Sequence, residues 1–186
     1  MGQGVGQGLA RFLTDIARYA RITVDTCGCI YFLERESKRF PLARELFLEA
    51  ARGHVEIELA GITLTELLVH PFQTGDRREI EVVLTLAKRQ AGVRTTPLTE
   101  SVLIAAAQVR AATRLKVPDA LVVASAAISG CGAIVGNDQD FEVINRLAPM
   151  RLVLPGARAL TMPRYLHFDD YLIESAEPVS IPRRTT

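Results

Sequence analysis

The sequence contains few residues of the kinds that carry redox, nucleophilic or base-stacking chemistry. It has three scattered histidines, no tryptophan, and only 6% aromatic residues among 186. The scarcity of aromatics argues against a platform on which nucleic-acid bases stack. Cys27, Cys29 and Cys131 form no CxxC pair, so we expect small buried side chains in a reducing compartment rather than a zinc or redox site.

Long apolar runs and a strong excess of charge are also missing. No apolar stretch approaches the roughly 20 residues that a membrane span needs, and the Gly/Gln-rich start from Met1 to Gly8 does not resemble a signal peptide. The formal net charge is only +1, whereas a protein that binds duplexes through bulk charge is expected to be more basic. We therefore expect a cytoplasmic protein with no membrane partner, in which any nucleic-acid contact comes from a local patch.

Short strands that are apolar on both faces alternate with amphipathic helices along the chain. The expected strands are Ile22–Val24, Val55–Leu59, Val93–Pro97, Ala133–Val135 and Met150–Leu154. This alternation favours an α/β fold with a parallel sheet covered by helices.

The length suits one domain, and we find no internal repeats. We expect a flexible lead over residues 1–8 and a helical extension over 9–21. The main domain then spans 22–154, followed by a partly disordered C-terminal extension over 155–186.

Four acidic positions have a common reason to face one rim of the sheet. Asp25 ends the first strand, and Asp138 follows the strand that ends at Val135. Glu66 and Asp119 lie near the beginnings of helices. Because sites in open parallel sheets form outside the carboxyl ends of the strands, we expect these side chains to converge.

Each of these acids also has a purely structural interpretation: Asp25 as a helix cap, Glu66 as a solvated helix residue, Asp119 as a first-turn acid, and Asp138 as a turn residue. Together they require a counter-charge, since two unit charges about 4 Å apart repel by about 4 kcal/mol at an effective dielectric constant of about 20. An all-oxygen set without histidine or cysteine suits Mg²⁺ or Mn²⁺ rather than zinc.

The motifs around these acids resemble a known family. They are Val24-Asp25-Thr26, Thr63-Leu64-Thr65-Glu66-Leu67-Leu68, Val117-Pro118-Asp119-Ala120-Leu121 and Ile134-Val135-Gly136-Asn137-Asp138-Gln139-Asp140-Phe141. The pattern is similar to that of the PIN-domain nucleases, with the VapC-type toxins of toxin–antitoxin systems as the closest group. The resemblance spans roughly Ile22 to Leu154.

The resemblance implies a three-layer α/β/α sandwich, PIN-like, with a central, mostly parallel sheet of about five strands. It also implies a metal-dependent endoribonuclease, often a homodimer, that a small antitoxin inhibits by covering the acidic pocket. Carried over by position, Asp25, Glu66, Asp119 and Asp138 would be the catalytic, metal-binding quartet. Family members often have Thr or Ser where this chain has Gly136, which leaves open whether Asp138 completes the site or whether Asp140 or Asn137 shares that role.

Two basic residues, Lys116 and Arg114, lie close to Asp119 in the sequence. They would steer substrate phosphates toward the acidic pocket or, in the structural interpretation, form a solvated helix face. Three other functions remain open. They are a PIN nuclease that processes RNA or DNA outside any toxin system, a PIN-fold module that binds RNA or protein without cleaving, and a small phosphotransfer-type α/β domain with an acidic magnesium site.

Overall fold

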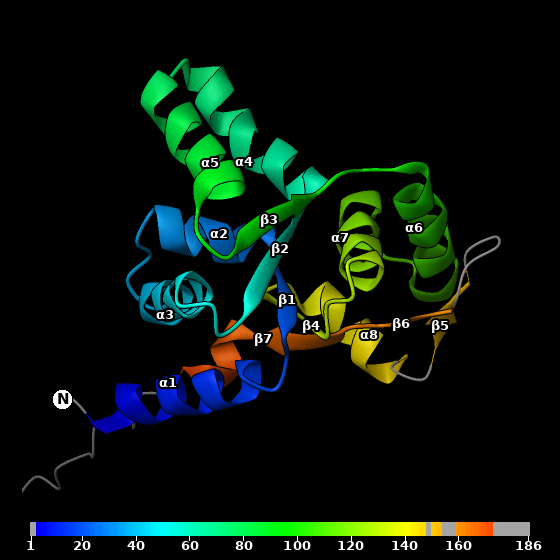
Figure 1. Cartoon of the computed structure of the whole chain (residues 1–186), viewed down its shortest axis with the longest axis horizontal. Coiled ribbons are helices and arrows are strands. Elements are labelled where there is room, and N and C mark those ends of the chain that lie inside the picture. Colours follow the sequence, from blue (N-terminus) through cyan, green and yellow to red (C-terminus); the bar gives the residue numbers. More distant parts are fainter. Residues whose placement is uncertain (1–2, 148–149, 154–158, 173–186) are drawn as a thin grey trace, which may run out of the picture.

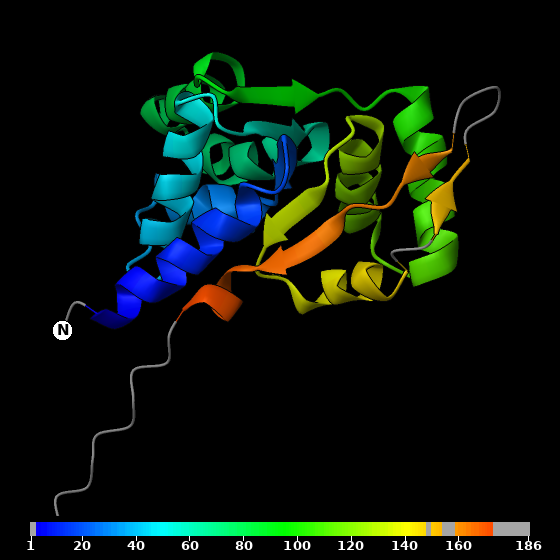
Figure 2. The ribbon, with the colours of Figure 1, turned by 60° about the horizontal axis from the view of Figure 1, so that its bottom comes forward.

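The computed structural model describes residues 3–147, 150–153 and 159–172. Its centre is a parallel sheet of five strands in the order β3-β2-β1-β4-β7 (Figures 1 and 2). The strands are β1 (Arg21–Val24), β2 (Glu56–Ala60), β3 (Val93–Thr96), β4 (Ala133–Gly136) and β7 (Arg164–His167). The predicted α/β fold with a five-stranded parallel sheet is confirmed.

Helices cover both faces of this sheet. They are α1 (Gln3–Ile16), α2 (Thr26–Leu33), α3 (Phe40–Ala51), α4 (Gly61–Thr74), α5 (Arg77–Arg89), α6 (Glu100–Thr113), α7 (Val117–Ile128) and α8 (Glu142–Arg146), with two short 3-10 helices, η1 (Gln139–Phe141) and η2 (Phe168–Tyr171). One buried cluster joins the sheet to α1, α2 and α3, and a second joins it to α6, α7 and α8. These layers make the α/β/α sandwich (Figure 1). None of the described helices is both long and apolar enough to cross a membrane.

The last strand of the central sheet is not where the sequence predicted it. Of the predicted strand at 150–154, residue 154 lies outside the described residues, and residues 150–153 contribute β5 (Arg151–Leu152), which pairs antiparallel with β6 (Leu160–Thr161) in a separate two-stranded sheet. The fifth central strand is β7, which pairs with β4 from within the segment predicted as the C-terminal extension. The prediction of a central strand at 150–154 is wrong because it followed the more apolar run, whereas β7 is an edge strand with exposed and buried side chains.

Two helices extend beyond the ends that the sequence indicates, which are Leu9 for the first and the residues just before Pro71 for the second, since proline disfavours helix in the residue that precedes it. Helix α1 begins at Gln3 rather than Leu9, within the segment predicted as the lead. Helix α4 continues through Pro71 to Thr74, where Gly75 ends it with a φ of 71°. The predicted disorder at the C-terminal end falls largely on residues 173–186, which lie outside the described residues.

The two ends of the described chain pack together. Phe12 of α1 lies 5.7 Å from Phe168 and 5.0 Å from Tyr171, measured between ring centroids. The Tyr171 hydroxyl also donates to Asp15 of α1 at 3.0 Å. Helix α1 and η2 therefore share one aromatic cluster.

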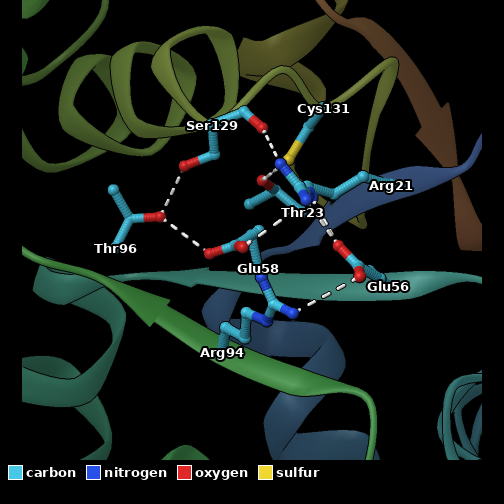
Figure 3. A network of polar contacts seen from close by, with 8 residues as sticks. All are labelled: Arg21, Thr23, Glu56, Glu58, Arg94, Thr96, Ser129 and Cys131. Atoms are coloured by element: carbon cyan, nitrogen blue, oxygen red, sulfur yellow. Dashed lines mark hydrogen bonds and ion pairs between the residues drawn. The ribbon is translucent and has the colours of Figure 1, made fainter.

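A polar network joins β1, β2 and β3 to the end of α7 (Figure 3). Arg21 donates to Glu56 at 2.8 Å and to the carbonyl oxygen of Ser129. Glu58 is buried and accepts from the Thr96 hydroxyl at 2.9 Å, and that hydroxyl also lies 2.6 Å from the hydroxyl of Ser129. The network thus satisfies a buried carboxylate in the middle of the sheet.

Candidate functional site

Five acidic side chains line one pocket at the carboxyl-terminal end of the parallel sheet. The pocket has a volume of about 680 Å³. The acids that line it are Asp25, Glu66, Asp119, Asp138 and Asp140. The fold therefore brings together all of the acidic residues that the sequence singled out, from four separate elements or loops.

Asp25 lies where β1 ends and α2 begins. Although it occupies the N-cap position of α2, its side chain makes no capping hydrogen bond, so the purely structural interpretation does not explain it. The side chain is buried, and its Oδ2 accepts from the Cys27 thiol at 3.3 Å. Burial raises the pKa of Asp25 to about 6, and the charges of Glu66 and Asp119 add to the rise.

Glu66 lies in the second turn of α4 and is exposed. The Thr26 hydroxyl, from the first residue of α2, donates a hydrogen bond to its carboxylate. This contact links the beginning of α2 to α4 and holds the Glu66 side chain beside the residue that follows Asp25. Thr26 is a site residue that the sequence analysis did not single out.

Asp119 lies in the first turn of α7. Its Oδ2 atom is buried and has no hydrogen-bond partner among the described residues. Burial raises the pKa of Asp119, as do the charges of Asp138, Asp140 and Glu66, while Lys116 lowers it. A buried carboxylate oxygen without a partner is costly, which indicates that this group serves something other than packing.

The loop after β4 brings two acids to the pocket in different ways. Asp138 accepts from the backbone N–H of Asp140 at 2.9 Å and so caps η1. Asp140 pairs with Lys116 at 3.4 Å, and both side chains are exposed. Lys116 does not line the pocket but lies at its rim, because it pairs with Asp140, which does. Arg114, an exposed residue at the end of α6, does not line the pocket either.

The Cys27 thiol connects this loop to Asp25. Besides donating to Asp25, its sulfur accepts from the backbone N–H of Asn137 at 3.1 Å. Burial is the main cause of the raised pKa of Cys27, and the charge of Asp25 raises this pKa further. The thiol therefore stays protonated and acts as a structural hydrogen-bonding group. From the sequence, Cys27 was expected only as a small buried side chain.

The donor chemistry of the pocket fits a hard divalent cation. All five acids offer oxygen ligands, Asp119 has an unpartnered buried oxygen, and Asp25 carries a charge that burial disfavours. In the side-chain conformations of the described residues, no three His, Cys, Asp or Glu groups are close enough to hold an ion. Binding would therefore require some of the carboxylates to rotate closer together.

The family model of the PIN domain matches residues 22–147. No curated protein matches the sequence. Among solved structures, VapC20 of Mycobacterium tuberculosis, described as a toxin that cleaves the sarcin-ricin loop, is 17% identical, with a TM-score of 0.53 over 72% of this chain and 99% of its own.

Two further solved structures share the fold. A DNA-bound VapBC complex from Salmonella typhimurium is 19% identical, with a TM-score of 0.51 over 80% of this chain and 98% of that chain. The VapBC2 complex of Rickettsia felis, bound to a promoter DNA fragment, is 15% identical, with a TM-score of 0.51 over 65% and 90% of the two chains. At these identities the likeness concerns the fold alone.

Proposed function

The chain belongs to the PIN-domain family, and we propose from this premise that it is a metal-dependent endoribonuclease, the toxin of a toxin–antitoxin pair. The observation that carries the proposal is the gathering of five acids in one pocket at the carboxyl ends of the strands. The toxin and toxin–antitoxin structures with the same fold support it, one of them a toxin described as cleaving the sarcin-ricin loop.

The cation would be Mg²⁺ or Mn²⁺, held by Asp25, Glu66, Asp119 and Asp138, with Asp140 as an alternative to Asp138. When bound, such an ion supplies positive charge for a phosphodiester and acidifies a water for attack on phosphorus. Asp25 and Asp119 have raised pKa values. A nearby cation would favour the ionised forms of both.

Other residues of the chain prepare the site. The Thr26 hydroxyl and the Cys27 thiol hold the carboxylates of Glu66 and Asp25 by hydrogen bonds. Lys116 places a positive charge at the rim. Because phosphate groups are drawn to exposed cations, Lys116 would steer an RNA strand toward the acids.

The proposal includes a small antitoxin as partner, a homodimer as the assembled form and the cytoplasm as location. The VapBC complexes with the same fold support the antitoxin. Val69, Phe72 and Val82 expose about half or more of their surfaces on α4 and α5, which offers an apolar surface to a second chain.

A cleavage assay tests the catalytic part. The protein is incubated with a panel of RNAs, with and without Mg²⁺ or Mn²⁺, beside Asp25→Asn, Asp119→Asn and the control Glu81→Gln, an exposed acid on α5 outside the pocket. We expect the two pocket variants to lose at least about 100-fold in rate, since each removes a charged ligand, and the control to match the wild type. Cleavage that survives EDTA or both substitutions would contradict the mechanism.

The same assay, together with a growth test, separates the alternative functions. RNA binding without cleavage at any metal concentration would favour the binding module. The toxin role predicts that expression of the chain arrests growth and that a small protein encoded beside it relieves the arrest. Cleavage without growth arrest would instead favour a nuclease of RNA or DNA processing.

A further inference from the structure

Tyr165 is held in one position beneath the acidic pocket. Its ring stacks on Phe141, with centroids 5.3 Å apart and planes 28° apart. Asn145 bonds both backbone groups of Tyr165, accepting from its N–H at 2.8 Å and donating to its carbonyl oxygen at 3.0 Å. Phe141 and Asn145 belong to η1 and α8, directly after the acids of the β4 loop. Tyr165 is thereby coupled to the segment that carries Asp138 and Asp140.

The hydroxyl of Tyr165 lies directly behind Gly136. A Cβ atom at position 136 would lie 3.1 Å from this hydroxyl oxygen and 3.0 Å from the Cβ of Asp25. The absence of a side chain at Gly136 therefore leaves the space into which the hydroxyl reaches, on the side of Asp25. Tyr165 is only 4% exposed, and among the described residues its hydroxyl has no hydrogen-bond partner.

An unpartnered buried hydroxyl is unusual, because interior polar groups are almost always satisfied. The Tyr165 hydroxyl also remains a donor at any ordinary pH. Its pKa is raised, chiefly by burial and further by the charge of Asp25, while the backbone N–H of Asp138 lowers it. A fixed O–H donor that lies close to an acidic centre, and whose hydrogen has no acceptor among the described residues, has one suitable kind of partner nearby, an ionised carboxylate.

We propose that Tyr165 is a positioning residue of the acidic site, whose hydroxyl donates a hydrogen bond to the carboxylate of Asp25, directly or through one water, when that carboxylate binds a divalent cation. The inference rests on the proposed function, which supplies the cation. Its consequence is that Tyr165 selects the orientation of Asp25 that binds metal. Tyr165 does not touch the substrate.

Tyr165→Phe tests the proposal, because it keeps the stacked ring and both Asn145 bonds and removes only the hydroxyl. Binding of Mn²⁺ alone is measured by calorimetry, and thermal unfolding is measured with EDTA and with saturating Mn²⁺. We expect the Mn²⁺ affinity to fall at least about 10-fold, as when other groups that orient metal ligands are removed. The melting temperature in EDTA should stay equal or rise, because an unpartnered buried hydroxyl is lost.

Tyr171→Phe is the matched control. It removes a hydroxyl that bonds Asp15 on α1, away from the pocket, so it should lower the melting temperature in EDTA and leave the Mn²⁺ affinity unchanged. A Tyr165→Phe affinity within twofold of the wild type would overturn the proposal, as would equal losses of affinity in the two variants.

The outcomes separate this inference from the proposed function. A wild type that binds Mn²⁺ and cleaves RNA, with a Tyr165→Phe variant that does both equally well, overturns the role of Tyr165 alone. A wild type that binds Mn²⁺ but cleaves nothing overturns the proposed function, while the affinity of the variant still decides the role of Tyr165. A wild type that binds no Mn²⁺ overturns both.

Discussion

Arg39 and Asp169 form a two-point ion pair, with Nε 2.7 Å from Oδ1 and Nη2 2.8 Å from Oδ2. Arg39 lies just before α3, and Asp169 lies in η2 near the end of the described chain. The same Asp169 carboxylate accepts from the side chain of Asn137 at 3.4 Å. Because Asn137 lines the acidic pocket, this pair fixes the C-terminal segment against the loop that carries Asp138.

Asp169→Asn should lower the free energy of unfolding by about 1 kcal/mol at pH 7, a modest value because the carboxylate is partly exposed. Arg39 lowers the pKa of Asp169 below its ordinary value. The stabilisation by the Arg39–Asp169 pair is therefore fully present above the pKa of about 4 that Asp169 has in the unfolded chain. It is lost as the pH falls through the pKa of Asp169 in the folded protein. Urea unfolding at pH 7 and pH 3 measures it, with the exposed Asp170→Asn as control. An equal loss at both pH values would contradict the ion-pair explanation.

Asp25→Asn should stabilise the metal-free protein at neutral pH although it removes a proposed metal ligand. The folded pKa of Asp25 is about 6, above the unfolded value of about 4, so the wild type loses stability as the pH rises between these two values. The difference of about 2 units corresponds to about 3 kcal/mol. Thermal unfolding in EDTA should therefore favour the variant at pH 7.5, with a gain that disappears near pH 4. A variant less stable than the wild type at pH 7.5 would show that the carboxylate stabilises the fold.

Arg21→Met should destabilise the sheet by about 2 kcal/mol, because Glu58 is buried and loses the cation 3.8 Å away. Methionine keeps the apolar stem of the arginine. The control is Arg94→Met in the same network (Figure 3), whose pair with Glu56 is exposed and should contribute little. Chemical denaturation measures both variants. Similar losses of stability in the two variants would mean that Arg21 does not stabilise the buried carboxylate of Glu58.

Lys116→Met should weaken RNA binding without changing the stability of the fold, because its pair with Asp140 is exposed at both ends. The loss of one phosphate contact reduces the slope of log affinity against log salt by about 1. A salt series with the cleavage-deficient Asp25→Asn protein, with and without Lys116→Met, measures the slope. Lys88→Met on α5 is the control, and an equal effect of the two lysines would argue against a rim-specific role.

Much of the fold could be predicted because it depends on local patterns. Short apolar runs indicated β1, β2 and β4, and the amphipathic segments between them indicated helices. The convergence of Asp25, Glu66, Asp119 and Asp138 followed from one rule about the carboxyl ends of parallel strands. These features are recorded in the sequence because burial of one face and termination of a helix act on neighbouring residues.

Other features were decided only by contacts between distant segments. Whether Met150–Leu154 or Arg164–His167 joined the sheet depended on which segment could lie beside β4, and the less apolar one does so as an edge strand. The thiol of Cys27 between Asp25 and Asn137, and the hydroxyl of Tyr165 behind Gly136, likewise have no local signal. By itself the sequence determined most of the elements and the acidic residues, since periodicity and residue chemistry are local. The tertiary structure decided which groups orient those acids, since that depends on the packing of chain segments far apart in sequence.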